Sequence, residues 1–301
     1  MYRRDHVREG HMTEDDLFDG IPDSADDAWF NLQKILRSDL TGKDPGLFQA
    51  QNIAVINKMS EILRNGAFYY HYQPIVDKKA TILSLEALLR FSDFPNLEDM
   101  IAILEIHDAM KMMTASTFSL VIEDVRKLLL LDYSIPVSFN LSSSQLNTPG
   151  VAESIIASLG RDRIPFSMLI IEVTEHYLCK RNQAFIDNLH CLNRNNIELR
   201  LDDFGRGYSS LSSIIHFHFD AIKLDKSFIG HMEGNNLAAD IILAVRRFAD
   251  ENGLTVIAEG VETERQLVLL CSLGIRFFQG YYFGKPAGLG EIIKKLEMQE
   301  T

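Results

Sequence analysis

Four segments of the chain combine a short apolar run with an oxygen-bearing side chain at its end. The segments are VSFNLS, LIIEVTE, LRLDDFG and TVIAEG, and they carry Asn140, Glu172, the pair Asp202 and Asp203, and Glu259. Repeated apolar runs with polar ends are typical of a parallel barrel whose strand ends converge on one face. Carboxylate and amide oxygens are ligands that Mg²⁺ prefers. The pattern therefore predicts a two-metal hydrolase.

Further polar side chains stand at corresponding places, namely Glu86, Lys223, Asp225, Glu262 and Gln279. A single Asp at a strand end is usually a helix cap, but here six strands share the feature. So many carboxylates in one cavity would repel one another strongly unless cations compensated their charge. Because the predicted ligands are oxygens, we expect Mg²⁺ or Mn²⁺ rather than zinc.

The adjacent carboxylates Asp202 and Asp203 point to opposite sides of a regular strand. One of the two could bridge two metal ions only if the strand ends at this point. Gly205 and Gly207 follow directly, and glycine suits a chain that leaves a strand. We therefore expect the strand to end at these two residues.

Strand-like and helical patterns alternate around these residues. The runs FYYHYQPIVD and TILSLEALLRF, separated by the polar turn Lys78-Lys79, predict a β-hairpin. Six further strands are predicted near residues 136–141, 168–174, 197–203, 220–224, 254–259 and 275–279. Helices are predicted near 98–131, 150–160, 181–195, 209–217, 236–252, 263–273 and 288–298. Eight strands close a barrel that side chains fill, so we expect an α/β, TIM-like (β/α)8 barrel.

Composition limits the classes of protein that fit. With 301 residues and 46% hydrophobic composition the chain can bury one large core. Its cysteines, Cys179, Cys191 and Cys271, are odd in number and scattered, which favours free thiols. No apolar run reaches membrane-spanning length and no signal segment is evident, so we expect a cytoplasmic protein. A formal charge of −12 argues against binding a nucleic-acid polymer.

Residues 1–65 differ from the rest of the chain. They open with a mixed-charge and acidic stretch, and helical patterns follow over about Asp26 to Ser38 and Phe48 to Arg64. We expect an N-terminal extension of unknown function that is partly disordered and then helical. Residues 66–301 are predicted to form the catalytic domain.

Eight blocks of sequence resemble the successive signatures of EAL-domain phosphodiesterases. They are QPIVD (73–77), EALLR (86–90), FNLSSSQL (139–146), IEVTE (171–175), LDDFGRGYSSL (201–211), IKLDKSFI (222–229), IAEGVETERQ (257–266) and QGYYFGKP (279–286). The resemblance implies a (β/α)8 barrel with one antiparallel strand, which agrees with the hairpin. It also implies hydrolysis of cyclic di-GMP to linear pGpG with two Mg²⁺ or Mn²⁺ ions. Ca²⁺ is expected to inhibit, and a homodimer through the barrel is expected.

Carried over by position, the resemblance assigns a role to each candidate residue. The implied metal ligands are Glu86, Asn140, Glu172, Asp202, Asp203 and Glu259. The implied catalytic group is Lys223, Glu262, Gln279 and Glu175, with Lys223 orienting or deprotonating water and Glu175 holding the loop after Asp203. The implied substrate contacts are Gln73, Leu89, Arg90 and Asp225. Because carboxylates around a lysine hold it protonated, we favour Lys223 as an orienting cation.

Two features depart from the family pattern. The loop after Arg90 is short, which predicts a truncated rim of the substrate pocket. Arg206 stands where the family usually has a small residue, and we expect its side chain to point to solvent. These features leave a second hypothesis open, a catalytically weak or inactive EAL-like module that acts as a cyclic di-GMP receptor or protein-interaction domain.

Overall fold

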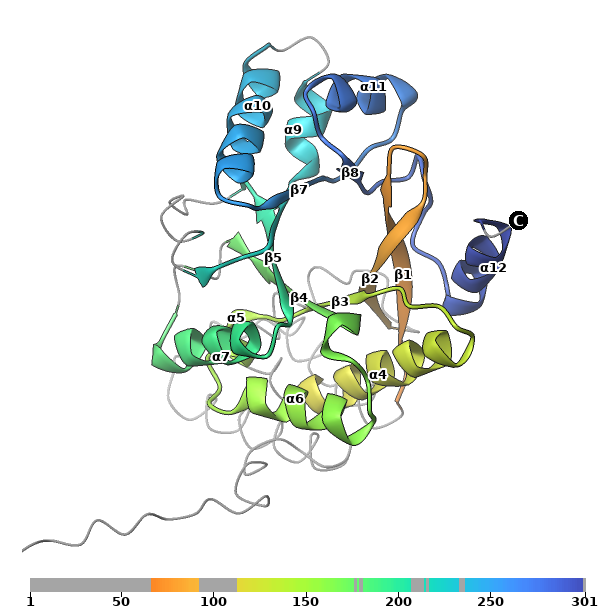
Figure 1. The fold of residues 1–301 in the computed structure, drawn as a ribbon, viewed down its shortest axis with the longest axis vertical. Helices are drawn as coiled ribbons and strands as arrows, with labels where there is room; N and C mark the ends of the chain where they lie inside the picture. The colour runs from red at the N-terminus through yellow and green to blue at the C-terminus, as the bar shows by residue number, and fades with distance from the viewer. Residues whose placement is uncertain are drawn as a thin grey trace, which may run out of the picture.

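The strands of the chain form a closed barrel in sequence order, from β1 to β8. The computed structural model describes residues 66–91, 113–175, 178, 181–206, 214, 217–232 and 236–299. The strands are β1 (Phe68–Asp77), β2 (Ile82–Phe91), β3 (Val137–Asn140), β4 (Leu169–Thr174), β5 (Glu198–Phe204), β6 (Ala221–Leu224), β7 (Thr255–Ala258) and β8 (Phe277–Phe278). Figure 1 shows them around one centre, with the helices outside. The predicted TIM-like barrel is confirmed.

Strand β1 is antiparallel to both of its neighbours. It pairs with β2 so that Gln73 lies opposite Glu86, and it pairs with β8 through Val76 and Asp77. The other adjacent strands are parallel. The hairpin turns where the Asp77 carboxylate accepts hydrogen bonds from the backbone N–H groups of Lys79 and Thr81. The predicted hairpin and the single antiparallel strand are therefore confirmed.

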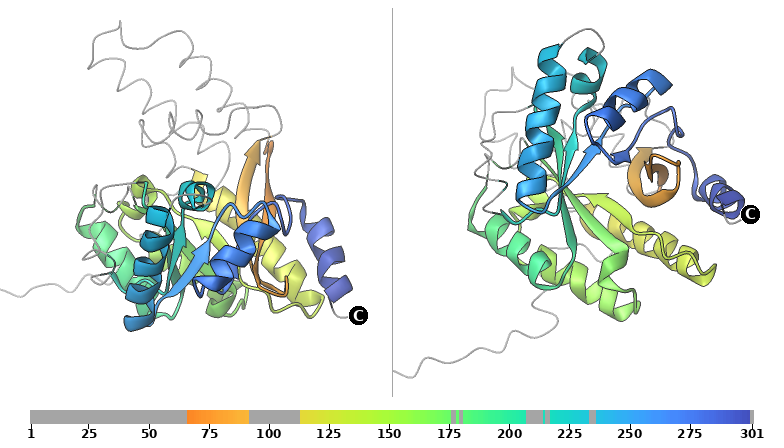
Figure 2. Two further views of the ribbon diagram at one scale, coloured as in Figure 1. Left: turned by 90° about the horizontal axis from the view of Figure 1, so that it is seen from above. Right: turned by 45° about the horizontal axis from the view of Figure 1, so that its top comes forward.

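The hairpin β1–β2 extends past the rest of the barrel. Only residues 85–87 of β2 pair with β3, whereas β1 and β2 pair along their whole length as far as Phe68 and Phe91. Figure 2 shows the two strands projecting beyond the other strand ends. Because β2 is parallel to β3 to β7, this projection lies at the carboxyl-terminal face of the barrel.

Amphipathic helices cover the outer face of the barrel. They are α4 (Thr114–Leu130), α5 (Ser143–Leu146), α6 (Val151–Arg161), α7 (Gln183–Arg194), α9 (Lys226–His231), α10 (Asn236–Glu251), α11 (Glu264–Ser272) and α12 (Leu289–Gln299), with a short 3₁₀ helix over Phe166–Met168. Capping boxes at Ser142 and Thr263 fix the starts of α5 and α11. The predicted helices at residues 1–65 and the short loop after Arg90 lie outside the described residues, as does most of the predicted helix 209–217.

Alternation along each strand separates an outer core from the barrel interior. On β6, Ile222 and Leu224 pack into the main core beneath the helices, so Ala221 and Lys223 face inward. Ala221 joins Ile75, Ile257 and Phe277 in a separate small apolar cluster. On β2 to β5 the inward-facing positions include the buried polar side chains Ser84, Glu86, Ser138, Glu172 and Arg200. The barrel therefore places its charged side chains on one wall and at the carboxyl-terminal end.

Candidate active site

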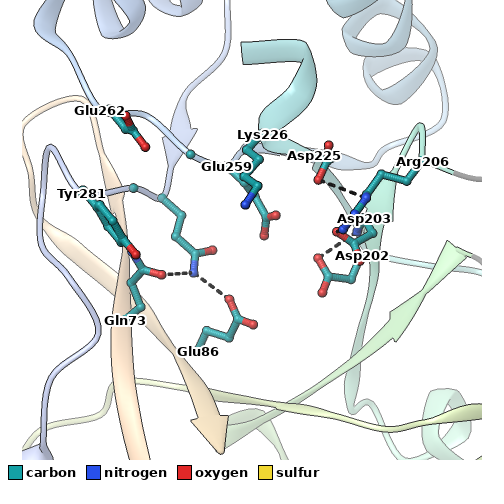
Figure 3. A pocket seen from close by; sticks show the side chains of 13 residues that line it. Gln73, Glu86, Asp202, Asp203, Arg206, Asp225, Lys226, Glu259, Glu262 and Tyr281 are labelled. Carbon is teal, nitrogen blue, oxygen red and sulfur yellow. Dashed lines mark hydrogen bonds and ion pairs between the residues drawn. The ribbon is translucent and has the colours of Figure 1, made fainter. Parts of the chain in front are cut away.

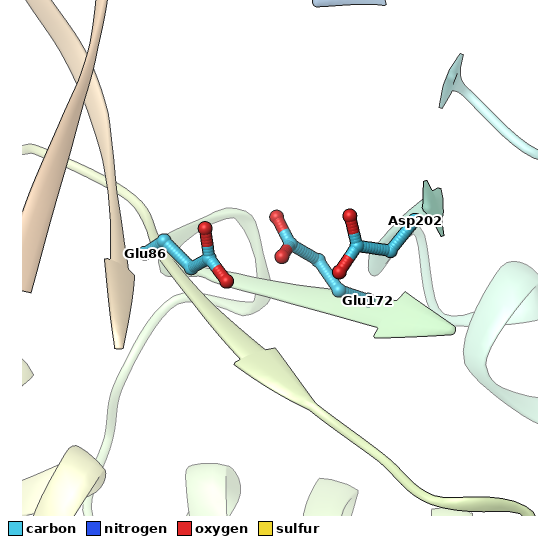
Figure 4. Close-up of side chains that lie close together, drawn as sticks. All are labelled: Glu86, Glu172 and Asp202. Atoms are coloured by element: carbon cyan, nitrogen blue, oxygen red, sulfur yellow. The ribbon is translucent and has the colours of Figure 1, made fainter. Parts of the chain in front are cut away.

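Three carboxylates from different strands converge at the carboxyl-terminal end of the barrel. Glu86 on β2, Glu172 on β4 and Asp202 on β5 each offer an oxygen, and these oxygens lie within 4.8 Å of one another. Figure 4 shows the three side chains pointing toward a common point. Glu172 is fully buried and Glu86 is 5% exposed. Burial of like charges at this spacing is unfavourable unless positive charge lies among them.

Lys223 supplies one such charge from β6. Its Nζ lies 2.7 Å from Glu172, 2.7 Å from Glu259, 3.0 Å from Glu86 and 3.1 Å from Asp202. Burial alone would lower the pKa of this fully buried lysine, but the four carboxylates outweigh it and hold the pKa well above its ordinary value. Lys223 therefore carries its proton at neutral pH, as expected for an orienting cation.

The carboxylates that surround Lys223 have unequal pKa values. Burial, together with the charges of Glu86 and Asp202, raises the pKa of Glu172 to about 7 despite the nearby lysine. Burial and the same two neighbours raise the pKa of Glu259 well above its ordinary value. Glu86 is also buried, but the charge of Lys223 and hydrogen bonds from Gln279, Lys223 and Asn140 lower its pKa. The cluster thus holds more negative charge than Lys223 compensates.

Amide side chains orient Glu86 from two sides. Asn140 Nδ2 donates to Glu86 Oε1 at 3.1 Å, and Gln279 Nε2 donates to Glu86 Oε2 at 2.6 Å. Gln279 Nε2 also lies 3.2 Å from Gln73 Oε1, and Gln73 donates to the carbonyl of Gly284. Figure 3 shows Gln73 and Glu86 linked by dashed lines through the side chain that lies between them. Glu86 on β2 is therefore hydrogen-bonded to β3 and to the residue that follows β8, and Gln279 extends the network to Gln73 on β1.

Strand β5 ends one residue beyond the pair Asp202 and Asp203, where the sequence predicts its end. Its last residue is Phe204, its register with β6 shifts between Leu201 and Phe204, and Asp203 has a φ of 55°. This left-handed residue redirects the backbone, so both carboxylates line one pocket. A strand end was expected to place Asp202 and Asp203 on the same side. The irregularity has that effect, because it also breaks the alternation of side chains between the two faces of the strand.

The loop that follows is held by Glu175. Its Oε2 accepts a hydrogen bond from the backbone N–H of Gly205 at 2.8 Å. Gly205 has a φ of 101°, and a Cβ there would come within 2.0 Å of the Phe228 ring. Only glycine fits this position, so Glu175 and Gly205 together fix the backbone beside Asp203.

Arg206 only partly meets the expectation that it points to solvent. Its side chain is 61% exposed, yet Nη1 lies 3.6 Å from Asp203 Oδ1 and Nε lies 3.9 Å from Asp225 Oδ2. Figure 3 shows the guanidinium reaching over the two carboxylates at the edge of the pocket. The negative charges of Asp203 and Asp225 account for this position of the guanidinium.

One pocket of about 440 Å³ unites most of these residues. The predicted site residues that line it are Gln73, Glu86, Asp202, Asp203, Asp225, Glu259, Glu262 and Gln279. The structure adds Lys226 and Tyr281, which sequence reasoning missed although they lie within the blocks IKLDKSFI and QGYYFGKP. Arg90 and Leu89 are not among the lining residues. They lie on the projecting end of β2, where Arg90 Nη1 donates to the Leu89 carbonyl.

The donor atoms of the cluster fit a divalent cation. Two buried acceptor atoms, Glu172 Oε1 and Gln279 Oε1, have no hydrogen-bond donor within the described part of the chain. Buried acceptors without a donor are costly, and a cation would satisfy them. The converging side-chain atoms that could bind a metal ion are carboxylate oxygens, which suit Mg²⁺ or Mn²⁺.

The sequence matches the family model described as EAL domain over residues 56–286. The chain belongs to the EAL domain family. It is 31% identical to the cyclic di-GMP phosphodiesterase RocR of Pseudomonas aeruginosa, over 85% of this chain and 68% of RocR. Several other curated relatives are matched over about half of their length or less.

Solved structures of EAL proteins have the same fold. The PaMucR phosphodiesterase, in complex with c-di-GMP, matches with a TM-score of 0.71 and 27% identity, over 79% of this chain and 99% of that one. BlrP1 of Klebsiella pneumoniae, in a manganese and cy-diGMP complex, matches with a TM-score of 0.66 and 26% identity, over 77% of this chain and 66% of BlrP1. Within the described part of this EAL chain, no helix is long and apolar enough to cross a membrane.

Proposed function

We propose that this chain is a phosphodiesterase that hydrolyses cyclic di-GMP to linear pGpG with the help of two Mg²⁺ or Mn²⁺ ions. The observation that carries the proposal is the convergence of Glu86, Glu172 and Asp202 around a protonated lysine, with buried acceptor oxygens left unsatisfied. Similarity to RocR, a cyclic di-GMP phosphodiesterase, and to the c-di-GMP complex of PaMucR supports the substrate class. The manganese complex of BlrP1 supports the class of cofactor.

The cluster divides between two ions in this proposal. The ligands are Glu86, Asn140, Glu172, Asp202, Asp203 and Glu259, with Asp203 able to contact both ions. Bound divalent ions would polarise the phosphodiester and lower the pKa of a water molecule. Gln279 and Glu262 support that water and the second ion.

The chain itself handles charge and protons during hydrolysis. The water loses a proton as its oxygen forms a bond to phosphorus, the bond from phosphorus to the 3′ oxygen breaks, and the 3′ oxygen gains a proton. Lys223 orients the water and stabilises the negative charge that develops on the phosphate oxygens. Gln73, Leu89, Arg90 and Asp225 are proposed substrate contacts. Glu175 keeps the Asp203 loop in place through Gly205.

The test is a turnover assay with a matched control. Purified protein is incubated with cyclic di-GMP and Mg²⁺ or Mn²⁺, and pGpG is followed by chromatography. Glu86→Ala should abolish turnover and keep the fold, as circular dichroism can check. Glu123→Ala, which removes an exposed carboxylate on α4, should leave turnover unchanged. Full activity of Glu86→Ala would contradict the assignment.

Arg206 favours one alternative function. Its guanidinium contacts Asp203, the residue proposed to bridge the ions, and so occupies space that a second cation would need. In that case the chain would be a cyclic di-GMP receptor or an interaction module with weak or absent turnover. Tight nucleotide binding without pGpG production would support the receptor, and turnover would exclude it.

Three broader expectations belong to the proposal. Residues 66–301 are the catalytic domain, residues 1–65 are an extension of unknown function, and the domain forms a homodimer in the cytoplasm. Light scattering coupled to size-exclusion chromatography tests the dimer. A mass of one chain at all accessible concentrations would contradict it.

A further inference from the structure

A second buried cation lies in the interior wall of the barrel. Arg200 is on β5, two residues before Asp202, and its side chain is 8% exposed. Its Cα pairs with Glu172 on β4 and with Ala221 on β6. None of the steps proposed for hydrolysis uses this arginine.

The Arg200 side chain connects the acidic cluster to the opposite end of the barrel. Nε donates to Glu198 Oε1 at 2.7 Å, and Nη1 donates to Ser84 Oγ at 3.1 Å. Nη1 also lies 3.8 Å from Glu172 Oε1, one of the two buried acceptors without a donor. That separation is an ion pair without a hydrogen bond. Arg200 therefore acts on Glu172 through charge and leaves the oxygen available.

The charges of the interior show what Arg200 contributes. Lys223 contacts four carboxylates, those of Glu86, Glu172, Asp202 and Glu259. When all four are ionised, as metal binding requires, one lysine leaves an excess of three negative charges, and Arg200 reduces the excess to two. Glu198 offsets Arg200 only in part, because its side chain is 40% exposed and water screens it. An excess of two equals the charge of one divalent ion.

We propose that Arg200 is a fixed counter-charge of the metal-binding cluster, which stabilises the ion-free barrel and weakens the binding of divalent cations. It is a positioning residue that acts through Glu172 and touches neither substrate nor ion. The proposal rests on the proposed metal site. A buried arginine keeps its charge at every accessible pH, so this contribution is permanent, unlike that of a bound ion.

The test compares three full-length proteins, the wild type, Arg200→Met and Glu198→Gln. Mn²⁺ binding is measured at one fixed pH by isothermal titration calorimetry, and the melting temperature is measured in chelator and in saturating Mn²⁺. Arg200→Met should bind Mn²⁺ about tenfold more tightly, because a positive charge near the ion is removed. Its melting temperature should fall in chelator and fall less in Mn²⁺. Glu198→Gln should bind Mn²⁺ several-fold more weakly, because the negative charge of Glu198 then no longer offsets part of the positive charge of Arg200 near the ion.

Opposite changes in the two variants separate the proposal from a packing role. If Arg200 only packs the interior, both melting temperatures fall equally and the Mn²⁺ affinity is unchanged, which would overturn the inference. Weaker Mn²⁺ binding by Arg200→Met would overturn it too. If Arg200→Met does not fold, Glu198→Gln decides, since unchanged or tighter binding contradicts the proposal. If the wild type binds no Mn²⁺, the proposed metal site itself is wrong.

Discussion

Lys223→Met removes the ammonium group at the centre of the acidic cluster and keeps most of the length of the side chain. The lysine Nζ lies 2.7 Å from two of the surrounding carboxylates and within 3.1 Å of the other two. Removing one partner of a buried ion pair typically costs about 3 to 5 kcal/mol, because the remaining charge stays buried without compensation. The total stability of a domain is only about 5 to 15 kcal/mol. The ion-free variant should therefore lose a large share of its stability.

The assay is urea denaturation followed by circular dichroism, first in chelator and then in excess Mn²⁺. The destabilisation should be smaller in Mn²⁺, because the ion supplies positive charge to the same carboxylates and binds only the folded state. The matched control is Lys294→Met, an exposed lysine on α12, which should change stability by less than about 0.5 kcal/mol. Equal losses in chelator and Mn²⁺ would refute the reasoning that the charge of Lys223 holds the cluster together.

The same variant also tests the role of Lys223 in hydrolysis. With Mn²⁺ bound, kcat should fall about 100-fold or more, the usual effect of losing one group that stabilises transition-state charge. Substrate binding, measured in Ca²⁺ to prevent turnover, should be largely kept. A comparable loss of binding and rate would instead make Lys223 a phosphate anchor.

Four further perturbations test separate parts of the site. Glu172 has a pKa raised to about 7 in the folded, ion-free protein, so this group favours folding at low pH and loses that contribution as pH rises from about 4.5 to 7, by up to about 3 kcal/mol. Glu172→Gln should flatten the pH dependence of the urea midpoint over that interval, and an unchanged slope would contradict the shift. Gly205→Ala should destabilise the protein by at least about 1 kcal/mol and reduce turnover, because its Cβ would collide with Phe228. Wild-type stability and turnover in this variant would contradict the close approach of Phe228 to this loop. Arg206→Thr should strengthen binding of the second Mn²⁺ a few-fold at most, the scale of an exposed ion pair, and calorimetry that shows weaker binding would place Arg206 outside the competition for Asp203. Replacing Mg²⁺ with Ca²⁺ should keep substrate binding and slow hydrolysis, because Ca²⁺ takes longer bonds and a looser shell, so undiminished turnover in Ca²⁺ would exclude the two-metal geometry.

The sequence predicted the barrel well because its signals are local. Apolar runs, the Lys78-Lys79 turn and polar strand ends identified eight strands, and the structure has all eight. The last strand was predicted near 275–279, but in the structure it spans only Phe277–Phe278. Strand limits depend on pairing with neighbours, and only two residues of β7 pair with β8. That pairing is a tertiary property that a single segment does not encode.

The parts of the site that sequence reasoning missed depend on the register between strands. In LRLDD, the period of two places Arg200 on the same face as Asp202, so a signal for its inward position was present. The contacts of Arg200 with Ser84 and Glu172 depend on which residues of β2 and β4 lie beside it. Likewise, the irregularity at Asp203 follows from how β5 meets β6. These relations required the three-dimensional arrangement.

The reversed direction of β1 determines where the chain enters the barrel. In a barrel of parallel strands only, the first strand begins at the face remote from the reacting groups. Here Phe68 lies opposite Phe91, so β1 begins at the carboxyl-terminal face and runs past Gln73 in the pocket wall. Any segment joined before Phe68 is therefore tethered at the mouth of the pocket. A conformational change in such a segment could therefore move the pocket wall at Gln73 through β1 alone, without a rearrangement of the barrel core.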